Sequence, residues 1–154
     1  MTSAQIIEVL VTAAAPISEL RGAIPLGLTF TDNWPIIFLI AFIGNLLPVP
    51  FLLLFLGPVT DLLSKISIFK KIISFVFRIS RRRGRIVEKY GAIGLTLFVA
   101  VPLPVTGAWT GSIVAFLLGM KFRKAFPAIV LGVFIAGIIV TSVAVVLDRS
   151  FFRD

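Results

Sequence analysis

The chain contains no cysteine and no histidine among its 154 residues. The lack of cysteine excludes disulfide bonds and thiol nucleophiles, and it leaves the redox compartment undetermined. Without either residue type there is no Cys or His metal site and no Ser-His or Cys-His catalytic pair. We therefore expect a protein that is not an enzyme and that holds neither a metal ion nor a cofactor.

Charged residues are also scarce, at 14% of the chain, whereas 58% of the residues are apolar and the mean hydropathy is +1.10. A surface exposed to water needs a larger polar share than this. The uncharged runs 33–60 and 90–120 have 28 and 31 residues, and each is longer than the roughly 20 apolar residues that cross a bilayer. The composition predicts an all-α integral membrane protein.

Basic residues account for the formal net charge of +8, and they are clustered. Of the 15 lysines and arginines, nine lie within 65–89 and three within 121–124. Aromatic residues that could stack on bases do not interleave the basic run that starts at Arg78, which argues against nucleic-acid binding. Basic loops are typical of the cytoplasmic side of a membrane. We expect a multi-pass protein of the cell membrane with a cytoplasmic linker over 61–89.

Two segments are long and apolar enough to span the bilayer as single helices. They are residues 35–57 and 125–147, with 23 residues each, and charged residues flank both. The sequence that begins at Pro35 superposes without a gap on the sequence that begins at Pro127. This match is the first sign that the two halves of the chain are related.

Two other apolar stretches are broken at their centres. Residues 4–31 are interrupted by Glu19 and Arg21, and each remaining arm is too short to cross the membrane. Residues 90–120 are interrupted by the segment 102–107, which holds two prolines and a glycine. We expect each stretch to be a re-entrant helical hairpin whose tip reaches the middle of the bilayer.

The order of these elements predicts an inverted repeat. Residues 1–60 and 90–154 each give a hairpin followed by one spanning helix, and the linker 61–89 joins them. If both basic stretches are cytoplasmic, the two spanning helices run in opposite directions and both termini lie outside. The linker has apolar residues at helical spacing, which indicates either an amphipathic surface helix or a plain helical connection.

The chemistry of the chain is expected at the two hairpin tips. Glu19 and Arg21 are the only formal charges between Glu8 and Asp32, and charges at such depth pair, face a cavity or mark a pathway. A poorly hydrated carboxylate favours its protonated form, so Glu19 is a candidate proton carrier, and Arg21 can grip a phosphate or carboxylate. The alternative is an ion pair that only holds the tip together. The predicted substrate or ion pathway comprises Glu19, Arg21, Gly22, Pro25, Asn45, Pro104, Thr106, Gly107, Trp109 and Thr110.

Several of these residues also have a purely structural interpretation. Asn45 could face the cavity or form a hydrogen bond between helices. Thr106 and Thr110 could line the second tip or serve helix packing, and Trp109 could line the pathway.

Two motifs carry a resemblance to a known family. Residues 16–27 read Pro-Ile-Ser-Glu-Leu-Arg-Gly-Ala-Ile-Pro-Leu-Gly, and residues 102–111 read Pro-Leu-Pro-Val-Thr-Gly-Ala-Trp-Thr-Gly. Together they resemble the small multidrug export protein family over essentially the whole chain. The first motif is the more specific of the two.

That family is in turn remotely similar to the DedA group of the VTT membrane protein superfamily. The similarity implies inverted hairpins and the proton-driven movement of polyprenyl phosphate or other lipids. DedA proteins place an arginine in the motif of the second tip, whereas here Thr106-Gly107-Ala-Trp109 has none. The resemblance therefore carries over only to Glu19 and Arg21.

These observations predict a small secondary transporter, with membrane lipids and a lipid-phosphate or amphiphilic substrate as partners. A homodimer is expected, because two spanning helices and two hairpins cannot shield polar tips from lipid on all sides. Three alternatives remain open: an uncoupled lipid scramblase or channel, an exporter of amphiphilic drug cations, and a membrane scaffold without transport.

Overall fold

The computed structural model describes residues 1–63, 85–103 and 106–152, and all regular structure within these ranges is helical. The predicted all-α fold is confirmed for this part of the chain. Most of the linker 61–89 lies outside the described residues, and so does Pro104. The helices are α1 (Ser3–Ala14), α2 (Glu19–Leu28), α3 (Trp34–Leu46), α4 (Pro48–Leu63), α6 (Arg85–Ala100), α7 (Ala108–Leu117) and α8 (Phe122–Phe152).

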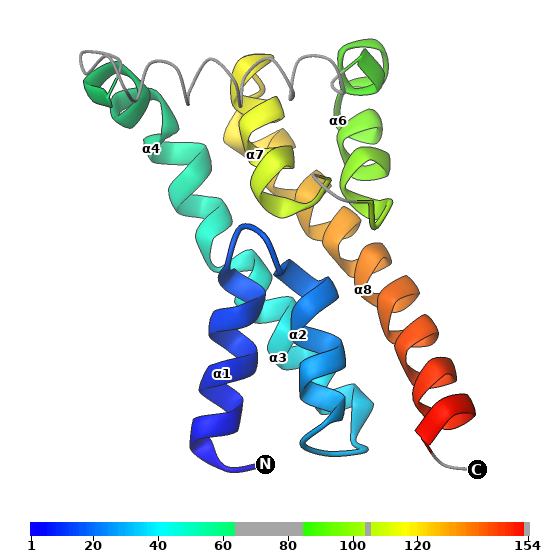
Figure 1. Cartoon of the computed structure of the whole chain (residues 1–154). Helices are drawn as coiled ribbons and strands as arrows, with labels where there is room; N and C mark the ends of the chain where they lie inside the picture. The colour runs from blue at the N-terminus through cyan, green and yellow to red at the C-terminus, as the bar shows by residue number, and fades with distance from the viewer. Residues whose placement is uncertain (64–84, 104–105, 153–154) are drawn as a thin grey trace.

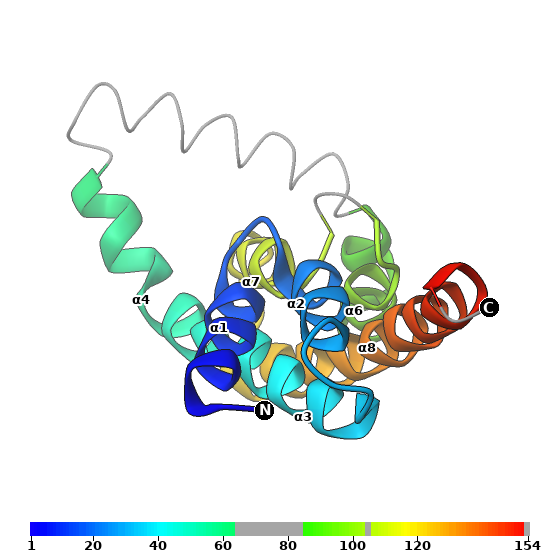
Figure 2. The same ribbon diagram turned by 60° about the horizontal axis from the view of Figure 1, so that its bottom comes forward.

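Two pairs of short helices point toward each other from opposite ends of the molecule. The pair α1 and α2 starts at the end that holds both termini, and the pair α6 and α7 starts at the other end (Figure 1). The C-terminal ends of α1 and α6 and the N-terminal ends of α2 and α7 lie at mid-height. Figure 2 shows α3 and α8, which pack on each other, along one side of the two pairs.

The break between α1 and α2 follows from Pro16. The residue before a proline is pushed out of the helical region, and Ala15 has φ −72° and ψ 141°. The helix therefore ends at Ala14. The hydroxyl of Ser18 then donates a hydrogen bond to the carbonyl of Thr12 at 3.0 Å, which closes the turn.

The break between α6 and α7 depends on glycine as well as proline. Pro102 follows the end of α6, and α7 starts directly after Gly107, whose φ of 153° and ψ of −164° only glycine adopts readily. The first arm of the hairpin predicted over 90–120 starts earlier than expected. Helix α6 starts at Arg85 and bends at Gly91, where φ is 58°.

The two segments predicted to span the bilayer correspond to the long apolar helices of the structure. These are residues Trp34–Leu56, with 23 residues, and Phe122–Leu147, with 26 residues. The first was expected as one helix and is divided into α3 and α4 at Leu47, although its backbone stays helical. The reason is local, because Pro48 and Pro50 lack the amide protons that would continue the hydrogen-bond ladder.

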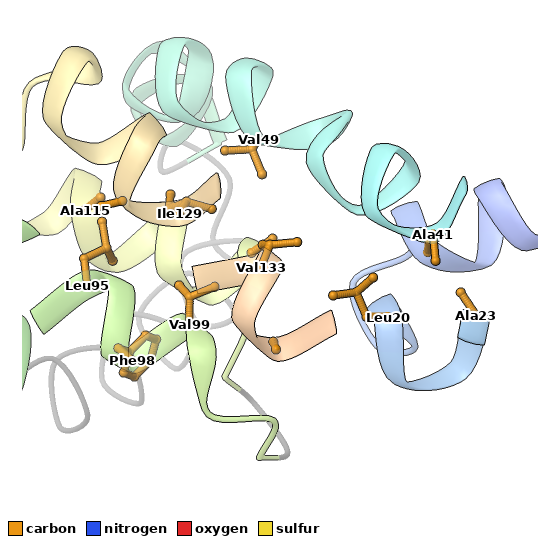
Figure 3. Packing of buried hydrophobic residues seen from close by; sticks show 14 of the residues in the cluster. Leu20, Ala23, Ala41, Val49, Leu95, Phe98, Val99, Ala115, Ile129 and Val133 are labelled. Atoms are coloured by element: carbon orange, nitrogen blue, oxygen red, sulfur yellow. The ribbon is translucent and has the colours of Figure 1, made fainter. Parts of the chain in front are cut away.

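The buried core extends through both halves, and α8 connects them. Figure 3 shows Val133 of α8 and Leu20 of α2 between two groups of buried side chains. On one side lie Leu95, Val99, Ala115 and Ile129, and on the other lie Ala23 and Ala41.

Close helix contacts depend on small residues. A Cβ atom added to Gly44 would lie 2.6 Å from the carbonyl oxygen of Leu10 and 2.9 Å from the Cβ of Ala13. Between α6 and α8, the hydroxyl of Thr96 donates to the carbonyl of Ala128 at 3.1 Å. Small residues and hydrogen bonds of this kind hold helices together in lipid, where the hydrophobic effect does not.

We predict that Gly44→Leu destabilises the protein, because the new side chain must push α1 away from α3. Overpacking of this kind costs about 1–3 kcal/mol. Thermal unfolding of the purified chain in detergent measures the effect. The control is Ile43→Leu, which places the same side chain at the neighbouring half-exposed position. Equal unfolding temperatures for the two variants would contradict the packing role of Gly44.

Candidate functional site

Glu19 is a buried carboxylate in an unusual backbone conformation. It is the first residue of α2, only 6% of its surface is exposed, and its φ is +45°. A left-handed conformation costs a residue with a side chain about 1–2 kcal/mol. Such strain persists only where the surroundings impose it, and it is typical of functional sites.

The carboxylate of Glu19 lies against the N-terminus of α7, in the other half of the chain. The backbone N–H of Trp109, the second residue of α7, donates a hydrogen bond to Glu19 Oε1 at 3.3 Å. The N-terminus of a helix carries partial positive charge and favours an anion. A Cβ atom at Gly107 would collide with this carboxylate. Gly107 therefore provides the space that Glu19 occupies.

Arg21 connects the same two tips. One of its guanidinium nitrogens, Nη2, is 3.8 Å from Glu19 Oε2 and donates a hydrogen bond to the carbonyl of Thr106. The buried hydroxyl of Thr106 accepts from the N–H of Leu103 at 3.1 Å, and it lies 2.6 Å from the carbonyl of Val101. Thr106 thus shapes the turn whose carbonyl Arg21 binds.

Trp109 adds a further link between the tips. Its indole Nε1–H donates to the carbonyl of Ala14 at 3.0 Å, at the last residue of α1. This bond satisfies a carbonyl that the end of α1 leaves free. Trp109 therefore binds Glu19 through its backbone and the first hairpin through its ring.

Asn45 is the polar residue of the spanning segment that reaches the same pocket. It is 1% exposed, and its Oδ1 is buried without a hydrogen-bond partner among the described residues. An unpaired buried acceptor costs about 1–3 kcal/mol. Asn45 thus lines the pocket, and its Oδ1 accepts no interhelical hydrogen bond from the described residues.

The pocket between the tips is small. The volume open to the centre of a water-sized sphere is about 10 Å³, which is room for about one water molecule. A larger substrate would require the tips to separate. The pocket is lined by Glu19, Leu20, Arg21, Asn45, Val99, Pro102, Thr106, Gly107, Ala108, Val133, Ala136 and Val140.

Some residues of the predicted pathway lie elsewhere. Gly22 packs within the first hairpin, where an added Cβ would lie 2.7 Å from Ser18 Cβ. Pro25 is exposed on α2, and Thr110 is half-buried on α7. None of the three lines the pocket.

Helix α8 contributes a wall of the pocket that was not predicted from the sequence. Val133, Ala136 and Val140 lie at spacings of three and four residues on one face of α8. That spacing indicates a common helix face. All three residues are apolar, so nothing in their chemistry indicates that this face of α8 meets the hairpin tips.

Residues 19–139 match the family described as "Putative small multi-drug export protein". No curated protein and no solved structure matches the chain. The matched range covers most of the chain, and it includes Glu19, Arg21 and the break between α6 and α7. Together with the two long apolar helices, the match indicates a membrane protein. The chain therefore belongs to the small multi-drug export protein family.

Proposed function

We propose that the chain is a small secondary transporter whose substrate passes between the two hairpin tips, with Glu19 as the group that takes up and releases a proton. One observation carries this proposal. A buried carboxylate from one half rests on a helix N-terminus from the other half, beside an arginine. The family description, which refers to export, supports a transport role.

The proposed topology is an inverted repeat of a re-entrant hairpin and a spanning segment. In support, the two helix pairs point toward each other from opposite ends (Figure 1). Helices α2 and α7 have 10 residues each, which is about 15 Å, or half of the roughly 30 Å hydrocarbon core. The basic linker would lie in the cytoplasm and both termini outside.

Proton binding would change what the tips can hold. As long as Glu19 is ionised, its carboxylate occupies the N-terminus of α7 and faces Arg21, and it fills the place of an anion. A proton removes that charge and weakens both interactions. The helix N-terminus and Arg21 would then be free for an acidic group such as a lipid phosphate.

The direction in which substrate affinity changes with pH depends on the charge of the substrate. An anionic substrate would bind more tightly as the pH falls, because Glu19 competes with it only when ionised. A cationic amphiphile would bind more tightly as the pH rises, because it needs the ionised carboxylate. Arg21 is the other charged residue that lines the described pocket, and it favours the anionic class.

A scaffold without transport is the second candidate, and the contacts between the tips favour it. Arg21 binds Thr106, and Trp109 binds Glu19 and Ala14, so the pair could simply hold the two halves together. An uncoupled scramblase or channel would use the same tips without a proton. In each case we propose a homodimer, whose second copy would cover Arg21, because one chain leaves 28% of its side chain exposed.

We predict that a proton gradient drives flux of a labelled polyprenyl phosphate into proteoliposomes that contain the chain, and that Glu19→Gln abolishes it. Glutamine preserves the size of the side chain but cannot exchange a proton. The matched control is Glu8→Gln, because Glu8 is exposed on α1 and lies away from the tips. The control variant should keep the flux of the native chain.

The same assay separates the alternatives. Flux that is independent of the gradient and survives in Glu19→Gln would indicate a scramblase or channel. A gradient-driven flux of a cationic dye, but not of the lipid, would indicate a drug exporter. The absence of flux for both substrates, with the fold of Glu19→Gln intact, would support the scaffold.

We predict that single cysteines at Thr2 and Ser150 react with a membrane-impermeant maleimide from outside intact cells, whereas Lys121→Cys reacts only after the membrane is opened. The chain has no cysteine of its own, so each variant reports one position. Labelling of Lys121→Cys together with Thr2→Cys from the same side would contradict the inverted arrangement.

A further inference from the structure

A groove lies on the outer surface between α3 and α8, away from the tip pocket. Its volume is about 460 Å³, within the range of small-molecule sites. All of its lining residues are apolar. They are Phe42 of α3 and Phe126, Pro127, Val130, Leu131 and Phe134 of α8.

Aromatic contacts hold the walls of the groove in place. The rings of Phe42 and Phe134 meet edge to face at 6.0 Å between centroids, and Phe38 contacts Phe134 at 5.7 Å in the same geometry. An added Cβ at Gly137 would lie 2.7 Å from the Phe38 ring, so this glycine lets the ring approach α8. The groove is therefore formed before any ligand enters it.

The groove remains open to its surroundings. The exposed fraction is 53% for Leu131 and 43% for Phe134. Both side chains can contact an apolar ligand that lies along α8.

One end of the groove is strongly basic. Lys121, Arg123 and Lys124 are all exposed, and they lie within one or two turns of Phe126 at the start of α8. The sequence from 121 to 134 contains no acidic residue, so no carboxylate within this part of the chain neutralises the three cations. The N-terminus of α8 adds positive charge at the same place.

The length of the groove matches one leaflet of a bilayer. Phe134 lies ten residues after Lys124 along the helix, which corresponds to a rise of about 15 Å. Half of the hydrocarbon core is also about 15 Å. An extended apolar ligand that starts at the basic end would therefore end near the middle of the membrane, beside Phe42 and Phe134.

We propose that this groove is a binding site for an anionic phospholipid, whose headgroup lies on the three basic residues and whose acyl chain lies along Phe126, Leu131 and Phe134. Charge complementarity selects the headgroup, since basic residues near the membrane surface attract anionic lipids. The apolar walls of the groove favour the acyl chain of the lipid. This site is independent of the transport pathway at the tips.

The test is native mass spectrometry of the full chain in a neutral detergent, titrated with phosphatidylglycerol and with phosphatidylcholine of the same acyl chains. We expect one phosphatidylglycerol to remain bound per chain, with an affinity about tenfold or more above that of phosphatidylcholine. The triple variant K121Q/R123Q/K124Q should lose this preference. The control Lys89→Gln, at an exposed position of α6, should keep it.

A second pair of variants tests whether the acyl chain of the lipid binds along the groove. Leu131→Gln should weaken binding of both lipids, whereas Ile139→Gln, also partly exposed on α8 but outside the groove, should not. Equal affinity for the two lipids, or a preference that survives in the triple variant, would overturn the proposal. So would a disulfide-linked dimer of Leu131→Cys that excess phosphatidylglycerol does not suppress, because a second copy would then occupy the groove.

Discussion

The interaction on which the rest of the structure depends is the contact between the Glu19 carboxylate and the N-terminus of α7. A charge that is 6% exposed in an apolar protein must be compensated. The compensation comes from the Trp109 N–H, the partial charge of the helix end and the guanidinium of Arg21. The first two of these require α7 to start in the interior, and therefore a chain that turns back at mid-height.

The remaining elements make that interior start possible. The breaks between the paired helices leave backbone groups unpaired inside the protein, and the side chains of Thr106, Ser18 and Trp109 satisfy part of them. Helix α8 packs against both hairpins with small and branched residues, and it helps to bury Glu19, Asn45 and Thr106. Gly44 and Gly107 remove side chains where the backbone or the carboxylate must come close.

Much of the arrangement was predictable, because proline and glycine mark its breaks. Ala15 leaves the helical region since Pro16 follows it, and length alone identified the two long apolar helices. The division of the first of them at Leu47 was harder to predict, because Pro48 and Pro50 can either end a helix or only bend it. The positive φ of Glu19 and the contribution of Val133 to the pocket could not be predicted. Both arise from packing between distant segments, which leaves no local pattern in the sequence.

The fit of Glu19 beside Gly107 also limits how such a chain can change over generations. A side chain at residue 107 would displace the carboxylate, while a shorter acid at residue 19 would leave the space empty and the helix end uncovered. Neither residue can vary freely without the other, although they belong to different halves of the chain. The two halves are therefore expected to change in a correlated way. A half exchanged between two relatives would fit only where the residues at positions 19 and 107 still match in size.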